Sequence, residues 1–228
     1  MEIIPSKNNF LKSNIYIIIL SLVLTTIFIN CVGVLVEPYF NDKQNFNFAL
    51  IVLQQMLLAL MIYYFIKHKV LNKIGELLKV PDIKLLFKEI SKTYFYLIGI
   101  SIFLGVFQFY FSVSIPGFNQ QMDVFSLFPS KGILFYLTIF NAAIIAPVLE
   151  ELIFRGALLK NMLNKYSKST SIIFSSAIFS LIHFQPEVFG AIFLISVLIS
   201  NLFLQTNSLI APILFHILNN TIKTVISL

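Results

Sequence analysis

The sequence predicts an all-α protein, a single polytopic membrane bundle of about seven transmembrane helices with a basic amphipathic helix at the interface. Of the 228 residues, 58% are hydrophobic and only 11% are charged. A soluble domain carries about 25% charged residues, so this composition disfavours a soluble enzyme, a disordered chain and a nucleic-acid binder. Long apolar stretches recur along the whole chain, and no linker or internal repeat separates them. We therefore expect one membrane domain over residues 1–228.

The first predicted span covers residues 13–36 and follows Lys7 and Lys12. Its apolar core is longer than the h-region of about 7–15 residues in a signal peptide, and no A-x-A-like cleavage site follows. We therefore expect an uncleaved anchor. The remaining spans are predicted at residues 46–66, at 93–115, from Gly132 through Glu150 and Glu151, from Ser169 to His183, at 188–204, and from Ser208 to the C-terminus.

Residues 67–92 form a different kind of segment, too polar to span a membrane. Apolar residues recur at helical spacing with lysines between them, Pro81 interrupts the pattern, and the same spacing resumes after it. The apolar positions are Val70, Ile74, Leu77, Leu78, Ile83, Leu86, Phe87 and Ile90. The pattern predicts an amphipathic element in the membrane interface, most simply a linker between two spans.

The distribution of basic residues predicts the orientation in the membrane. With a cytoplasmic N-terminus, 13 of the 16 Lys and Arg residues fall on the inside, which agrees with the positive-inside rule. An odd number of spans then places the C-terminus outside the cell. The net charge of +6 thus points to an anionic membrane surface as partner, with no nucleic acid. The many Lys, Ile, Asn and Phe residues and the single arginine suggest a bacterial cell membrane.

Two adjacent carboxylates, Glu150 and Glu151, lie inside the fourth predicted span. A charged side chain near the bilayer centre costs at least about 2.5–3.5 kcal/mol, so its presence there needs a reason. Arg155 follows Glu151 by four residues, and on a helix the two side chains share a face and can pair. We expect that pair to be structural. Glu150 is rotated by about 100° and remains available for chemistry.

Two histidines and an asparagine lie in the later apolar spans, at His183, His216 and Asn220. Counting residues from the predicted turns places Glu150 and His183 at a similar height, roughly 22 Å above the cytoplasmic turn that joins their spans. The same count places His216 and Asn220 at roughly 12 and 18 Å. All four groups are therefore expected in the membrane interior, where an ionisable residue is by default a candidate functional residue.

These groups suit amide hydrolysis without a covalent intermediate. A carboxylate in an apolar, partly wet cavity suits a general base that activates water, and a histidine and an asparagine amide can donate to an oxyanion. The same Glu150, His183 and His216 could instead bind zinc and lower the pKa of a bound water. The H-E-x-x-H and G-x-S-x-G motifs are absent, and Cys31 is the only cysteine, which excludes an intramolecular disulfide. Metal dependence stays open, with a metal-free site preferred.

At these residues the sequence resembles the CPBP family, which comprises the CAAX prenyl endopeptidases of the Rce type and the bacterial Abi proteins of bacteriocin processing and immunity. E-E-L-I-F-R-G at 150–156 is similar to the family motif E-E-x-x-x-R, F-S-L-I-H at 179–183 to F-x-x-x-H, and H-I-L-N-N at 216–220 to H-x-x-x-N. The match covers about residues 139–222, within a motif-bearing core at 131–228. The span between the two histidines departs from the family, with Ser196 and Ser200 where glycines are common.

The resemblance implies an intramembrane endopeptidase that acts on membrane-associated peptides or proteins, possible substrates being bacteriocin precursors and pheromones. It assigns Glu150 and His183 to water activation, His216 and Asn220 to the oxyanion, and Glu151 and Arg155 to support. A non-enzymatic immunity or scaffold protein that binds a toxin or partner is the alternative. A transporter that uses the polar cluster as a proton path is weaker, because no repeats or paired broken helices are visible.

The basic-residue distribution makes a direct prediction about topology. Alkaline phosphatase fused after Leu228 should be active, because the C-terminus is expected outside, and a fusion after Lys79 should be inactive. Enzyme activity of the two fusions in whole cells measures this. The reverse pattern would contradict the predicted orientation.

Overall fold

The computed structural model describes residues 7–71, 74–112 and 131–227, and over these residues the chain is helical with no β-strand. The predicted fold class is thus confirmed. The α-helices are α1 (Lys7–Val36), α2 (Lys43–Lys67), α3 (Ile74–Leu77), α4 (Ile83–Phe111), α5 (Gly132–Phe140), α6 (Ala146–Glu151), α7 (Lys160–Leu163), α8 (Lys168–Leu181), α9 (Phe189–Thr206) and α10 (Ile210–Ser227). Two π-helical segments, η3 (Asn141–Ile145) and η4 (Leu152–Leu159), join α5, α6 and α7 into one long helix.

In the described part of the chain, five helices are long and apolar enough to cross a membrane, rather than the seven that we expected. They are Asn14–Tyr39, Lys43–Lys67, Ile83–Phe111, Gly132–Leu163 and Pro186–Thr206, and Ile210–Ile226 is a shorter apolar helix. The protein is therefore a multi-pass membrane protein, and the predicted count of seven is not confirmed.

The predicted fifth span is shorter than expected. Helix α8 has 14 residues, or roughly 21 Å, which is less than the bilayer core of about 30 Å. Its end lies at Leu181 because Phe184 adopts the left-handed conformation (φ 51°) and Pro186 disfavours a helical residue before it. His183 therefore lies in the turn after the helix rather than within a span.

The predicted amphipathic segment at 67–92 is not one continuous helix, and its place in the membrane interface stays a prediction. Among its described residues before Pro81, Lys67 ends α2 and the four residues of α3 are helical, whereas the part after Asp82 belongs to α4. The Asp82 side chain accepts hydrogen bonds from the backbone N–H groups of Lys84 and Leu85, both at 3.0 Å, and thereby caps α4. Helix α4 consequently begins ten residues before the predicted third span, whose predicted end at residue 115 lies outside the described residues.

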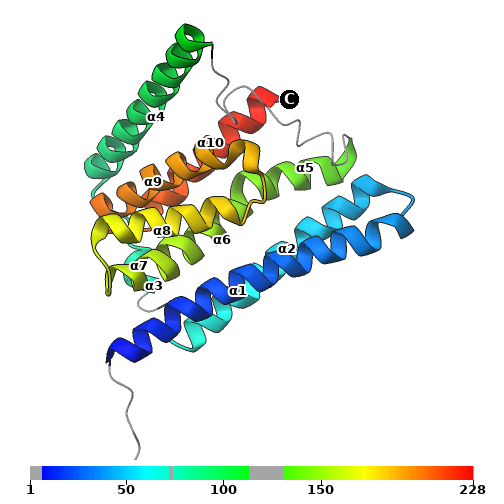
Figure 1. Cartoon of the computed structure of the whole chain (residues 1–228), viewed down its shortest axis with the longest axis horizontal. Helices are drawn as coiled ribbons and strands as arrows, with labels where there is room; N and C mark the ends of the chain where they lie inside the picture. The colour runs from blue at the N-terminus through cyan, green and yellow to red at the C-terminus, as the bar shows by residue number, and fades with distance from the viewer. Residues whose placement is uncertain (1–6, 72–73, 113–130, 228) are drawn as a thin grey trace, which may run out of the picture.

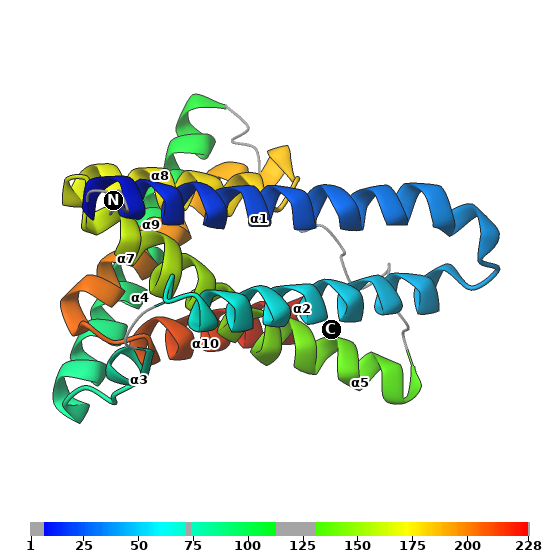
Figure 2. The same ribbon diagram turned by 90° about the horizontal axis from the view of Figure 1, so that it is seen from below.

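The helices pack as layers, with the hairpin of α1 and α2 on one flank, α4 on the other, and α5 to α10 between them (Figure 1). Figure 2 shows α1 and α2 running side by side in opposite directions. The long broken helix lies in the middle (Figure 1) and contributes several fully buried side chains, among them Ala157, Leu158 and Leu159. The main core comprises Ile18 and Leu22 of α1, Phe65 of α2, Phe154 and Leu158 of η4, Phe179 of α8 and Phe203 of α9.

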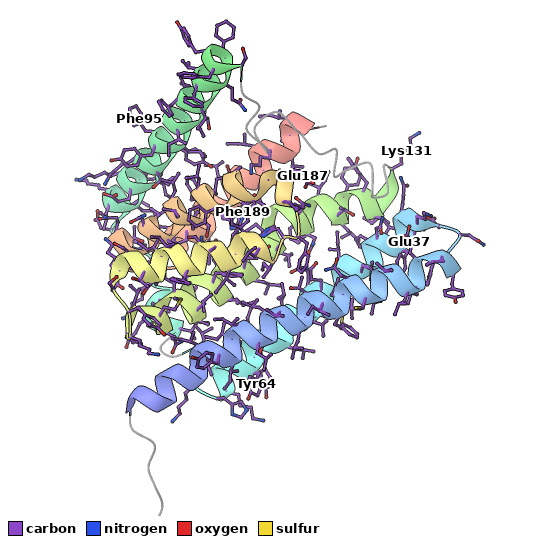
Figure 3. All side chains as sticks on the ribbon, viewed as in Figure 1. Glu37, Tyr64, Phe95, Lys131, Glu187 and Phe189 are labelled. Atoms are coloured by element: carbon purple, nitrogen blue, oxygen red, sulfur yellow. The ribbon has the colours of Figure 1, made fainter. Side chains whose placement is uncertain are left out.

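The outer surface is apolar, as a bilayer requires. Figure 3 shows Phe95 on the outside of α4, where 74% of it is exposed, and Tyr64 near the end of α2. Only the N-terminal third of α4 is buried, through Leu86, Glu89 and Thr93. A second small core joins this part of α4 to α9 and α10. The remaining surface of α4 is suited to contact lipid.

The segment between α2 and α4 fixes the start of α10. The Leu209 N–H donates to the Leu77 carbonyl at 2.7 Å, and the Ser208 hydroxyl donates to the Lys79 carbonyl at 2.7 Å. On the other side of the segment, the Asn161 amide donates to the Val70 carbonyl at 3.0 Å. These bonds hold α7 and α10 in register, and α10 carries His216 and Asn220.

Candidate active site

The two glutamates lie at a break in the helical hydrogen-bond pattern. Helix α6 ends with Glu150 and Glu151, and π-helical segments precede and follow it. Pro147 contributes to the break because it has no N–H to donate to the preceding turn. Short π-helical segments often occur at functional sites, because they change the direction in which side chains project.

Glu151 and Arg155 form a buried ion pair, which confirms the predicted pairing. The Arg155 Nη1 donates to Glu151 Oε1 at 3.0 Å, and the two side chains are 1% and 0% exposed. Nη2 donates to both the carbonyl and the hydroxyl of Ser196 on α9, each at 2.9 Å. The guanidinium also lies 5.0 Å from the ring centroid of Phe179. The planar fork of arginine thus connects three helices in a way that a lysine cannot.

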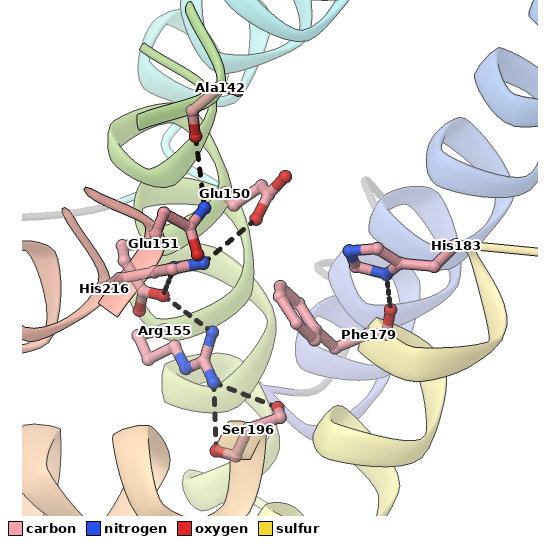
Figure 4. A network of polar contacts seen from close by, with 9 residues as sticks. Ala142, Glu150, Glu151, Arg155, Phe179, His183, Ser196 and His216 are labelled. Atoms are coloured by element: carbon pink, nitrogen blue, oxygen red, sulfur yellow. Dashed lines mark hydrogen bonds and ion pairs between the residues drawn. The ribbon is translucent and has the colours of Figure 1, made fainter. Parts of the chain in front are cut away.

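His216 lies between the two carboxylates (Figure 4). Its Nδ1 is 2.8 Å from Glu151 Oε1, and its Nε2 is 3.8 Å from Glu150 Oε2. An ionised carboxylate only accepts hydrogen bonds, so Nδ1 carries the proton in the contact with Glu151. The contact with Glu150 is too long for a hydrogen bond. The structure therefore places His216, rather than His183, beside the proposed base.

Exposure separates the two glutamates. The Glu150 side chain is 21% exposed, whereas Glu151 is fully buried and held by Arg155 and His216. A group that activates water must be reachable by water. Glu150 is therefore the more accessible of the two carboxylates, and its reactive role stays a prediction.

His183 approaches the site from the end of α8. Its Nδ1 lies 2.7 Å from the Phe179 carbonyl, and because a carbonyl only accepts, Nδ1 carries the proton and Nε2 has the lone pair. Figure 4 shows His183 apart from the cluster of His216, Glu150 and Glu151, with Phe179 between them, and no direct contact joins His183 to Glu150 within the described part of the chain. The Phe179 ring packs against both histidines, with centroid distances of 4.9 Å to His183 and 6.1 Å to His216.

Asn220 lies one helical turn beyond His216 on α10. Its side-chain Nδ2 donates to the Ala142 carbonyl in η3 at 3.1 Å. An asparagine amide has two N–H donors, so this bond leaves a second donor for another acceptor. Asn220 is thus in contact with the helix that carries Glu150 and Glu151.

Among the described residues, no group of three or more His, Cys, Asp and Glu side chains is placed to hold a metal ion. Glu150 and His216 are close together, whereas His183 lies across the Phe179 ring from His216. Zinc binding by these three residues stays a prediction.

Two parts of the network were not predicted as site residues. Ser196 was noted only as a small residue where the family has glycine, yet both its carbonyl and hydroxyl accept from Arg155. The Ala142 carbonyl belongs to the backbone, so the residue type at position 142 does not reveal it as an acceptor. Ser196 could have been suspected from the sequence, because a serine in an apolar span has a buried hydroxyl that needs a hydrogen-bond partner.

Residues 132–222 match the family model described as Rce1-like, type II CAAX prenyl endopeptidase Rce1-like. We refer to the matched residues as the Rce1-like domain. The match confirms the resemblance to the CPBP family over the range from α5 into α10. Searches of the curated proteins and of the solved structures found no significant match to the chain. All six predicted site residues lie within the Rce1-like domain, whereas α1, α2 and α4 lie outside it.

The buried ion pair of the Rce1-like domain predicts a large effect on stability. Arg155→Ala should reduce the accumulation of folded protein, because it leaves the Glu151 carboxylate buried without its cation, at a cost of about 3–5 kcal/mol. Glu151→Gln should act in the same direction. Fluorescence-detected size-exclusion chromatography in detergent measures the folded fraction.

The control for this measurement is Lys168→Ala, which removes an exposed cation and should leave the folded fraction unchanged. Wild-type accumulation of Arg155→Ala would show that the pair does not hold the site together.

Proposed function

We propose that the chain is an intramembrane endopeptidase that hydrolyses peptide bonds of membrane-associated peptides or proteins. One observation carries the proposal. A partly exposed carboxylate, Glu150, lies beside His216, and His216 is held by the buried Glu151 next to it, within a domain that matches a family of endopeptidases. This arrangement provides a base and a hydrogen-bond donor in an environment of low polarity.

In the proposed reaction, Glu150 takes a proton from water, and the hydroxide attacks the carbonyl carbon of the scissile peptide bond. The tetrahedral intermediate collapses when the proton passes to the leaving amine. His183, whose Nδ1 is engaged by the Phe179 carbonyl and whose Nε2 remains available, is the proposed second hydrogen-bond partner of the water. His216 Nε2, when protonated, and the second N–H of Asn220 are the proposed donors to the oxyanion.

The substrate class is a peptide or protein segment at or in the membrane, because the site lies in an apolar bundle. Bacteriocin precursors and peptide pheromones belong to this class, and the sequence alone suggested them. The name of the matching family model adds a second probe, a prenylated peptide ending in a CAAX sequence. An internally quenched peptide of each kind, offered in proteoliposomes, distinguishes the two.

Glu150→Gln should abolish cleavage of whichever peptide the wild-type protein hydrolyses. The amide keeps the volume of the side chain and loses its basicity, so turnover should fall by at least about 10²-fold while the folded fraction stays near wild type. The initial rate of fluorescence release measures turnover.

Glu37→Gln serves as the matched control, because Glu37 pairs with Lys43 at the far end of the α1–α2 hairpin. It should retain wild-type turnover. Full cleavage by Glu150→Gln would contradict the proposed mechanism. A biological phenotype that persists in Glu150→Gln without any cleavage would favour the alternative, a membrane immunity or scaffold protein.

We propose that the hydrolysis proceeds without a metal ion. The position of Phe179 between His183 and His216 (Figure 4) supports this preference. The poor zinc affinity of an asparagine amide supports it as well. Elemental analysis of the purified protein should find far less than one zinc per chain, and cleavage should survive thorough chelation. Stoichiometric zinc that is lost in His183→Ala, together with chelator-sensitive cleavage, would overturn the preference.

A further inference from the structure

A backbone carbonyl next to the site has lost its usual donor. At the end of η3, the Ala146 N–H donates to the Asn141 carbonyl, five residues earlier, which is the π-helical pattern. In the same pattern, the Ala142 carbonyl would accept from residue 147. That residue is Pro147, which has no N–H. The Ala142 carbonyl is therefore without a backbone donor at the π-helical spacing.

A free carbonyl is costly inside a membrane protein, because no bulk water is present to satisfy it. In this structure the donor comes from another helix. The Asn220 amide of α10 donates to the Ala142 carbonyl at 3.1 Å. Figure 4 shows the bond beside the contacts of His216 with the two glutamates.

The position of this bond relates it to the site. Glu150 and Glu151 follow Pro147 by three and four residues, and His216 precedes Asn220 by four. The bond therefore joins a carbonyl about two turns before the glutamates to the turn after the histidine. It lies where α10 packs against η3, and the contact of His216 with Glu151 lies where α10 packs against α6.

We propose that Pro147 is a positioning residue, which leaves the Ala142 carbonyl free to accept from Asn220 and so holds His216 in register with Glu150 and Glu151. Asn220 thereby has a role beyond any contact with substrate, because one of its two amide hydrogens fixes α10 to the broken helix. The effect on catalysis rests on the proposed function, whereas the coupling between the two residues does not.

A double-mutant cycle of Pro147→Ala and Asn220→Ala tests the coupling without any substrate. Asn220→Ala should lower the melting temperature of the purified protein in detergent, because it leaves the Ala142 carbonyl unpaired. In the Pro147→Ala background residue 147 has an N–H for that carbonyl. Asn220→Ala should then cost less than half of its effect in the wild-type background.

Asn219→Ala is the matched control, since Asn219 is a buried neighbour on α10 and makes no bond to Ala142 within the described residues. Its effect should be the same in both backgrounds. Pro147→Ser supplies the same N–H if Pro147→Ala does not accumulate. Equal losses from Asn220→Ala in both backgrounds would overturn the proposal.

The catalytic consequence is measured with the quenched peptide that the wild-type protein cleaves. Pro147→Ala should lower kcat roughly tenfold and leave KM within about twofold, because it displaces the reacting groups and touches no substrate. Wild-type kcat, or a change in KM alone, would overturn the positioning role. Failure of the proposed function is a separate result, namely full cleavage by Glu150→Gln, and it leaves the melting-temperature cycle intact.

Discussion

The site depends on the Arg155 guanidinium, which is buried and must be neutralised where it lies. Glu151 supplies the charge, and the carbonyl and hydroxyl of Ser196 accept the remaining Nη2 hydrogens. A buried cation of this kind is tolerated only when its partners are in place, so the pair fixes α9 against the long broken helix. His216 then binds the same oxygen of Glu151 that Arg155 binds. The neutralisation of one buried charge therefore also helps to position α10.

This arrangement separates support from chemistry in two adjacent, identical residues. Glu151 is enclosed and its oxygen is shared by a cation and an imidazole, which favours one fixed geometry. Glu150 projects from the same helix into a less buried position, where its contact with His216 is long. The structural role of Glu151 thus does not extend to Glu150, the carboxylate that is proposed to take a proton from water. Irregular backbone around the pair, with π-helical turns on both sides, allows the two side chains to point in such different directions.

The rest of the fold provides a rigid, apolar surround. Phe179 contacts both histidines and the guanidinium, and Phe154 packs against it at a centroid distance of 4.8 Å. The turn after α9 donates hydrogen bonds to the backbone carbonyls of Leu77 and Lys79, and these bonds fix the start of α10. Outside this core, the exposed aromatic and aliphatic side chains of α1, α2 and α4 are suited to lipid.

The sequence by itself determined the membrane class, the helical fold and the Glu151–Arg155 pair, because these follow from composition, apolar length and the spacing within one helix. Its three motifs also located the Rce1-like domain. The tertiary structure decided which histidine lies beside Glu150, because the early end of α8 and the contact of α10 with α6 depend on packing between helices that are distant in sequence. It also decided the span count, since Phe184 ends α8 after 14 residues and α10 is one of the shorter apolar helices. The bond from Asn220 to Ala142 was out of reach of the sequence, because a backbone carbonyl becomes available only once Pro147 lies within the folded helix.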